Sequence, residues 1–188
     1  MSATPWNQSL LPIPGEPASP RWPAILQTWF PVFFFTCMIA LESTKVFGSD
    51  HTSAPLHNLL HSIFGAAIDP DWNHIHHLIR KAGHFTGYGM LSLVCFRGFH
   101  HSLRSHSNKL AAQILAHTLA IAAAFAIAGA DELHQCFLPN RTGCFADVLL
   151  DTAGALTLQL VVWLLLYIQA MRPSADPIPS CVLSSSAA

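Results

Sequence analysis

Residues 110–130 contain no formally charged side chain, and they end directly before two adjacent carboxylates, Asp131 and Glu132. A helix needs roughly 20 consecutive apolar residues to cross the hydrocarbon core of a bilayer. An uncharged run of this length therefore predicts a membrane-spanning helix. The two acids that follow it must have partners, because unpaired carboxylates are costly inside a membrane.

The composition of the whole chain supports a membrane location. The 188 residues are 52% hydrophobic and only 10% charged, whereas soluble domains carry about 25% charged residues. The formal net charge of −1 gives no electrostatic reason to expect a nucleic-acid partner. Since the apolar residues gather in blocks of bilayer length, we expect a polytopic helical membrane protein whose first partners are membrane lipids.

Four membrane spans are predicted, over about residues 24–41, 82–96, 110–130 and 148–171. The second run is short, so its helix must continue past Lys81 and Arg97, whose long side chains can reach the interface. The linkers after the second and third spans are short, which favours antiparallel neighbours. Gly83 and Gly87 are expected to let the second span approach a neighbour closely. The predicted fold class is all-α, a bundle of four transmembrane helices.

The long connection between the first two spans is expected to contain one or two interfacial helices. Its apolar residues follow the spacing of an amphipathic helix: Leu56, Leu59, Leu60, Ile63 and Phe64. With Trp72 nearby, we expect this helix to lie flat on the membrane surface. Asp69 and Pro70 are expected to cap and begin the helix that leads into the second span.

The two ends of the chain lie outside the predicted membrane domain of residues 21–172. Residues 1–20 are rich in proline and have no signal-peptide pattern, so we expect a disordered tail. Residues 173–188 are expected to be a second disordered tail. Five cysteines do not predict a disulfide framework, although Cys136 and Cys144 could pair in an oxidising compartment.

The distribution of basic residues predicts the orientation. The amino tail, second loop and carboxyl tail hold five lysines and arginines, whereas the first and third loops hold four. The positive-inside rule therefore places both termini in the cytoplasm.

Antiparallel spans bring certain helix ends to one membrane face. The start of the second span, the end of the third and the start of the fourth meet there, and the "ESTK" at 42–45 joins them. Nearly all the unusual polar residues lie at these ends. The candidate binding residues are Lys81, His84, Tyr88, Asp131, Glu132, Gln135, Arg141, Asp147 and Asp151. We expect the acids and bases among them to be partners in one partly wet pocket.

The segments "RKAGHFTGY" (80–88) and "DELHQCFLPNRTGCFADVLLDTAG" (131–154) resemble the VanZ-like membrane proteins. The resemblance rests on the order and spacing of the polar positions in these two segments, and it extends over roughly residues 24–171. It implies a bacterial inner-membrane protein of the cell envelope, and some members of the family contribute to teicoplanin resistance. It implies no known reaction.

Three functional readings remain open. The cluster could recognise an anionic lipid or an envelope-precursor group, helped by the positive ends of the helices that begin there. It could be an intramembrane enzyme with Glu132 or Asp131 as general base and His84 as the acid partner. It could also be a structural ion-pair network without a ligand. We expect no cofactor and no metal, since no HExxH or zinc-type cysteine spacing occurs, and a homo-oligomer stays open.

Overall fold

The computed structural model describes residues 22–44, 48–138 and 143–172, and within these ranges every regular element is helical. The elements are α1 (Trp22–Glu42), α2 (Ser49–Phe64), the short 3-10 helix η3 (Gly65–Ile68), α3 (Trp72–Ser102), α4 (Lys109–Gln135) and α5 (Phe145–Met171). The all-α prediction is confirmed for the described residues. The tails, 1–20 and 173–188, lie outside them.

Among the described helices, α1, α4 and α5 are long and apolar enough to cross a membrane. These helices correspond to the predicted first, third and fourth spans. The predicted second span lies in α3, which is not among the three. As expected, α3 continues well past both Lys81 and Arg97, because its polar ends are helical too.

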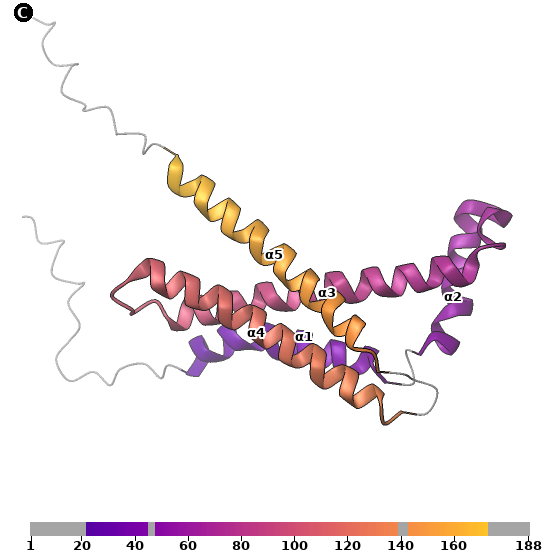
Figure 1. Cartoon of the computed structure of the whole chain (residues 1–188), viewed down its shortest axis with the longest axis horizontal. Coiled ribbons are helices and arrows are strands. Elements are labelled where there is room, and N and C mark those ends of the chain that lie inside the picture. The colour runs from indigo at the N-terminus through magenta and orange to yellow at the C-terminus, as the bar shows by residue number, and fades with distance from the viewer. Residues whose placement is uncertain (1–21, 45–47, 139–142, 173–188) are drawn as a thin grey trace, which may run out of the picture.

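Helix α3 is the centre of the packing and contacts α1, α4 and α5 (Figure 1). The face that α4 turns inward carries alanine at every fourth position: Ala112, Ala116, Ala120, Ala124 and Ala128. Small side chains on one stripe allow neighbouring helices to approach closely. The same stripe continues into Glu132, so the helix rotation that buries the alanines also buries this carboxylate.

The closest approach between helices lies where α3 crosses α5. A Cβ atom added to Gly154 would collide with the backbone carbonyl of Phe85 and lie 3.1 Å from its Cα, and one added to Gly89 would lie 2.9 Å from Leu158. The prediction that Gly83 and Gly87 make this contact is wrong, because no atom lies within 4 Å of an added Cβ at either position. The helix is rotated so that Gly89 faces α5 instead.

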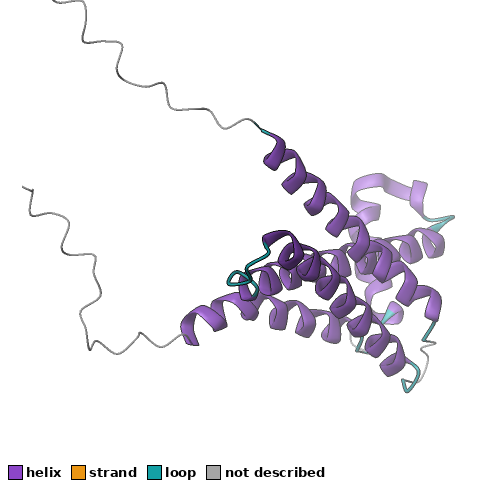
Figure 2. Ribbon diagram, turned by 60° about the vertical axis from the view of Figure 1, so that its left-hand side comes forward, coloured by secondary structure: helices purple, strands orange, loops and turns teal. Residues whose placement is uncertain are grey.

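Helix α5 packs on the bundle only through its first half. Its buried residues end at Gln159, whereas side chains from Leu160 to Met171 are largely exposed. In Figures 1 and 2 the second half of α5 projects away from the other helices. This half presents an apolar surface with no described helix against it.

The connection between α1 and α3 folds over the beginning of α3. The indole nitrogen of Trp72 donates to the Ser53 hydroxyl of α2 at 2.8 Å, and the His57 ring lies edge-on to Trp72. The prediction that Asp69 caps α3 is wrong, since Asp71 is the residue before the helix. The Asp69 carboxylate instead lies 2.9 Å from His57 Nε2, which ties η3 back to α2.

Candidate functional site

The end of α4 carries its acids into contacts with two neighbouring segments. Asp131 accepts a hydrogen bond from the Ser43 hydroxyl at the end of α1 and another, at 3.2 Å, from the Gln135 side chain. The Glu132 carboxylate accepts the backbone N–H of Cys144, just before α5, at 2.8 Å. Both carboxylates are buried. The polar end of the apolar run is therefore satisfied by protein groups, as buried polar atoms generally are.

A second set of contacts joins α3 to α5. Lys81 Nζ lies 3.2 Å from Asp147 Oδ1, and both side chains are partly exposed. One turn further on, His84 Nδ1 lies 3.6 Å from Asp151 Oδ1, and Asp151 is fully buried. The ring of Tyr88 stacks beside that of His84 with centroids 6.3 Å apart. Spacings of four and three residues place these pairs along one face of each helix.

The ends of α1 and α4 and the starts of α3 and α5 thus meet in one polar cluster. Of the residues expected from the sequence, all but Arg141 lie in it, and Arg141 lies outside the described residues. Cys136 and Cys144, whose pairing the sequence left open, are both free thiols.

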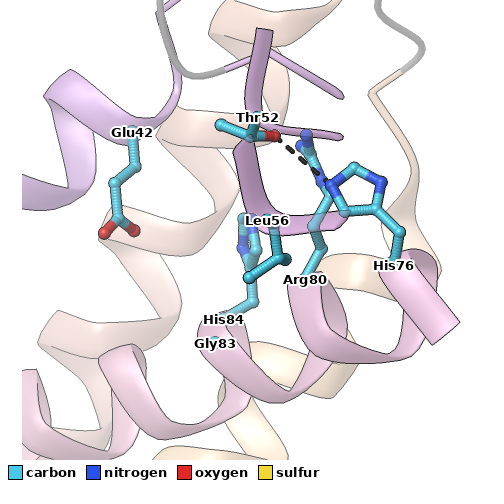
Figure 3. A pocket seen from close by; sticks show the side chains of 7 residues that line it. All are labelled: Glu42, Thr52, Leu56, His76, Arg80, Gly83 and His84. Atoms are coloured by element: carbon cyan, nitrogen blue, oxygen red, sulfur yellow. Dashed lines mark hydrogen bonds between the residues drawn. The ribbon is translucent and has the colours of Figure 1, made fainter. Parts of the chain in front are cut away.

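A pocket of about 200 Å³ lies beside this cluster, between α2 and the first half of α3 (Figure 3). It is lined by Glu42, Thr52, Leu56, His76, Arg80, Gly83 and His84. Figure 3 shows His76, Arg80 and His84 along successive turns of α3, with Thr52 and Leu56 of α2 across from them. The Thr52 hydroxyl lies 3.4 Å from His76 Nε2. His84 belongs both to the pocket wall and to the pair with Asp151.

The pocket wall is richer in basic than in acidic groups. Arg80 and two imidazoles line it, whereas Glu42 is its one acidic lining residue. Asp131, Asp147 and Asp151 are not among its lining residues. They contact Lys81, His84, Ser43 or Gln135. Ahead of the predicted span, burial, with help from the charges of Arg80 and His77, lowers the pKa of His76 below its ordinary value. A bound anion would offset this effect.

Sequence reasoning missed several of these groups. His76 is not among the binding residues predicted from the sequence, although its spacing of four and eight residues from Arg80 and His84 places it on their face. Thr52 carries no such signal, because only the folded path of the first connection brings α2 over α3. The Cys144 N–H is a backbone group and has no signature in the sequence.

The described residues contain no group of three or more histidine, cysteine, aspartate or glutamate side chains arranged to hold a metal ion. The site can form charge-assisted hydrogen bonds to an anion through Arg80 and, when protonated, through its histidines. It can also place an imidazole next to a buried carboxylate, which is a common way to orient a general base.

Comparison with known families gives a match that covers most of the chain. The model of the VanZ/LLP1 family matches residues 24–167, the region that contains every residue of the cluster. Comparisons with curated proteins and with solved structures gave no match. The matched range and the apolar helices identify a membrane protein, and the chain belongs to the VanZ/LLP1 family.

Proposed function

We propose that the chain is an inner-membrane protein that crosses the bilayer four times, through α1, α3, α4 and α5. Helix α3 has 31 residues and is therefore about 46 Å long at 1.5 Å per residue, well beyond the roughly 30 Å hydrocarbon core. It packs against all three apolar helices, which supports a crossing beside them. Both termini would then be cytoplasmic, and the polar cluster would lie at the outer face.

The function we propose is recognition of an anionic group, the head group of a membrane lipid or of an envelope precursor, in the pocket of Figure 3. The observation that carries the proposal is that Arg80, His76 and His84 line one small pocket. An arginine supplies several N–H donors that suit phosphate oxygens.

The position of the pocket fits a ligand that belongs to the bilayer. Helix α2 forms one wall, and its apolar side chains Leu59, Ile63 and Phe64 are each more than half exposed. Such a stripe can lie against the acyl chains below the head-group level. The pocket would then open at the depth at which phosphates are found, so a lipid could enter from the side.

Native mass spectrometry of the purified protein with added phosphatidylglycerol tests this function. Arg80→Gln removes the pocket's guanidinium, and Arg104→Gln removes one in the turn between α3 and α4, at the opposite end of α3. We expect Arg80→Gln to lower bound phosphatidylglycerol at least about fivefold, because a charge-assisted hydrogen bond contributes roughly 1.5–3 kcal/mol. Arg104→Gln should bind like the natural sequence.

A neutral lipid serves as the second control in that experiment. Phosphatidylcholine should bind equally to all three proteins, because the pocket would not select it. Equal phosphatidylglycerol occupancy in the natural sequence and in Arg80→Gln would contradict recognition and would favour an ion-pair network without a ligand.

A second candidate function, an intramembrane hydrolase or transferase, has one observation in its favour. His84 lines the pocket and lies next to the buried Asp151, as in sites where a carboxylate orients a catalytic imidazole. The roles that the sequence suggested for Asp131 and Glu132 are less favoured, because both carboxylates already accept hydrogen bonds from the protein. Conversion of a bound lipid by the natural sequence, lost in His84→Gln with lipid occupancy kept, would establish this function over recognition alone.

A link to glycopeptide tolerance depends on the ligand being an envelope precursor. In that case, expression of the natural sequence in a susceptible bacterium should raise the teicoplanin concentration needed to stop growth, and Arg80→Gln should not. A phosphatidylglycerol-specific pocket with no effect on growth would remove the link and leave recognition intact.

A further inference from the structure

Among the described residues that line the pocket of Figure 3, Glu42 is the one with a carboxylate. It is the last residue of α1, and the last turn of that helix contains no basic residue. The C-terminal end of a helix carries a partial negative charge, which repels a carboxylate and attracts a cation. A cation next to Glu42 would therefore be favoured both by its carboxylate and by the end of α1.

The described part of the chain does not supply this cation. Within that part, Glu42 forms neither an ion pair nor a hydrogen bond, and its side chain is exposed. The acids of the polar cluster each contact a protein group instead: Asp131, Glu132, Asp147 and Asp151. Glu42 thus differs from them in being open to a positive group from outside the chain.

The two signs of charge occupy different parts of the pocket. Figure 3 shows Glu42 on one side and Arg80 with His76 on the other. In this view the side chains of Leu56 and His84 lie between them. Glu42 and Arg80 line the same pocket without forming an ion pair with each other. One ligand could therefore place a negative group at one side, a positive group at the other and a short hydrocarbon link beside Leu56.

We propose that this pocket takes a zwitterionic head group, whose phosphate binds at Arg80 and whose primary ammonium binds at Glu42. This inference rests on the proposed function, because the phosphate is the anionic group assigned to the pocket above. It adds the ligand class, a phosphate ester of an amino alcohol. A primary ammonium carries several N–H donors, which suit a carboxylate. A quaternary ammonium has no N–H donor, so a phosphocholine group would not satisfy Glu42.

The volume of the pocket agrees with a head group of this size. It is about 200 Å³, and since one water molecule occupies about 30 Å³, it holds roughly seven groups of that size. This is enough for a phosphate, a short hydrocarbon link and an ammonium. The acyl chains of a lipid would stay outside, beside the exposed Leu59, Ile63 and Phe64 of α2.

Native mass spectrometry of the full-length protein tests the ammonium contact. Phosphatidylethanolamine and phosphatidylglycerol with the same acyl chains are added together in equal amounts, and the readout is the ratio of the two lipids bound. We expect Glu42→Gln to lower this ratio about twofold to fivefold, because a pair with an exposed carboxylate contributes modestly. With phosphatidylcholine in place of phosphatidylethanolamine, Glu42→Gln should leave the ratio unchanged. An equal fall with both lipids would overturn recognition of a primary ammonium.

Two further variants assign the effect to the charge at position 42. Asp71→Asn removes an exposed carboxylate just before α3 that does not line the pocket, and it should keep the natural ratio. Glu42→Lys reverses the charge and should shift the ratio further towards phosphatidylglycerol. Both Glu42 variants should fold, because the side chain is exposed and lies at an unfavourable helix end. A natural ratio in both of them would overturn the inference.

Arg80→Gln distinguishes this inference from the proposed function. It should lower the occupancy of phosphatidylethanolamine and phosphatidylglycerol alike, because both lipids carry the phosphate. If phosphatidylglycerol binding depended on Arg80 while Glu42→Gln left the ratio unchanged, the inference would fail and the proposed function would stand. If the ratio depended on Glu42 while neither lipid depended on Arg80, both would fail, because the phosphate would not lie at Arg80.

Competition identifies the source of the head group. Glycerophosphoethanolamine has the same phosphate and ammonium but no acyl chains. Its displacement of phosphatidylethanolamine from the natural sequence, but not from Glu42→Gln, would show that a water-soluble ester is sufficient. No displacement, together with a ratio that depends on Glu42, would identify the lipid itself as the ligand. Both results support the inference and differ only in the source.

Discussion

The carboxylates of Asp131 and Glu132 can be buried at the end of an apolar helix because protein groups donate the hydrogen bonds that water would otherwise supply. A serine at the end of α1, a glutamine one turn further along α4 and a backbone N–H before α5 donate to them. Buried carboxylates are usually satisfied in this way. The two contacts between α3 and α5 differ in exposure. Lys81 and Asp147 are partly exposed, whereas Asp151, which contacts His84, is fully buried.

This difference predicts unequal effects on stability. His84→Phe leaves Asp151 buried without its imidazole and should lower the free energy of unfolding by about 3 kcal/mol, as removal of one partner of a buried pair does. Lys81→Met should lower it by less than about 1 kcal/mol, because exposed pairs contribute little. Unfolding in detergent micelles measures both.

The double variant is the control for that experiment. Adding Asp151→Asn to His84→Phe removes the buried charge and should restore at least half of the lost stability. A double variant that is as unstable as His84→Phe, or equal effects of His84→Phe and Lys81→Met, would contradict a stabilising contact between His84 and the buried Asp151.

Protonation of His76 predicts a pH effect on stability. Because burial lowers the pKa of His76 in the folded chain, the unfolded chain takes up this proton more readily. Stability should therefore fall as the pH drops below the ordinary histidine range of about 6.5. His76→Gln should reduce this loss between about pH 7.5 and pH 5.5, measured by thermal unfolding.

Added phosphatidylglycerol should also reduce this loss of stability at acid pH, because an anion in the pocket favours a charged imidazole. His74→Gln, at a neighbouring exposed position of α3, is the control and should keep the full loss. If His76→Gln and the natural sequence lost the same stability at acid pH, His76 would play no part in this loss.

At the scale of elements, the crossing of α3 and α5 sets the distance between the two halves of the cluster. It depends on Gly154, whose position against the Phe85 backbone leaves no room for a methyl group. Overpacking a close contact costs about 1–3 kcal/mol. Gly154→Ala should therefore lower the unfolding temperature of the protein in detergent.

Gly129→Ala is the matched control within a helix. No atom lies within 4 Å of a Cβ added there, and alanine favours a helix over glycine by about 1 kcal/mol. It should leave the unfolding temperature unchanged or raise it. A Gly154→Ala protein as stable as Gly129→Ala would mean that the two helices cross elsewhere.

The sequence predicted the helices better than their rotation. Uncharged runs set the extent of α1, α4 and α5, and antiparallel order predicted that acids meet bases on α3, as Asp147 and Asp151 do. Asp131 instead accepts hydrogen bonds from Ser43 and Gln135. The choice of Gly83 and Gly87 failed because helical spacing does not say which face turns towards a given neighbour. Asp69 failed as a cap because a contact with His57 on α2 holds it elsewhere. Tertiary contacts decide both the rotation of a helix and the residue at which it begins.

At the scale of the whole molecule, everything depends on α3 crossing the membrane. Only then do the ends of α1 and α4 and the starts of α3 and α5 lie at one bilayer face, with the turn between α3 and α4 at the other. Helix α3 pairs a polar first half with a hydrophobic second half, and its packing against three apolar helices is what favours the crossing.

Labelling of single cysteines in intact cells with a membrane-impermeant maleimide tests this arrangement most directly. All native cysteines are first replaced by serine, and Asn73→Cys, before the crossing, or Ser105→Cys, after it, is then introduced; both positions are exposed. We expect Asn73→Cys to react from outside the cell and Ser105→Cys to react only after permeabilisation. Reaction of both positions from the same side would contradict it.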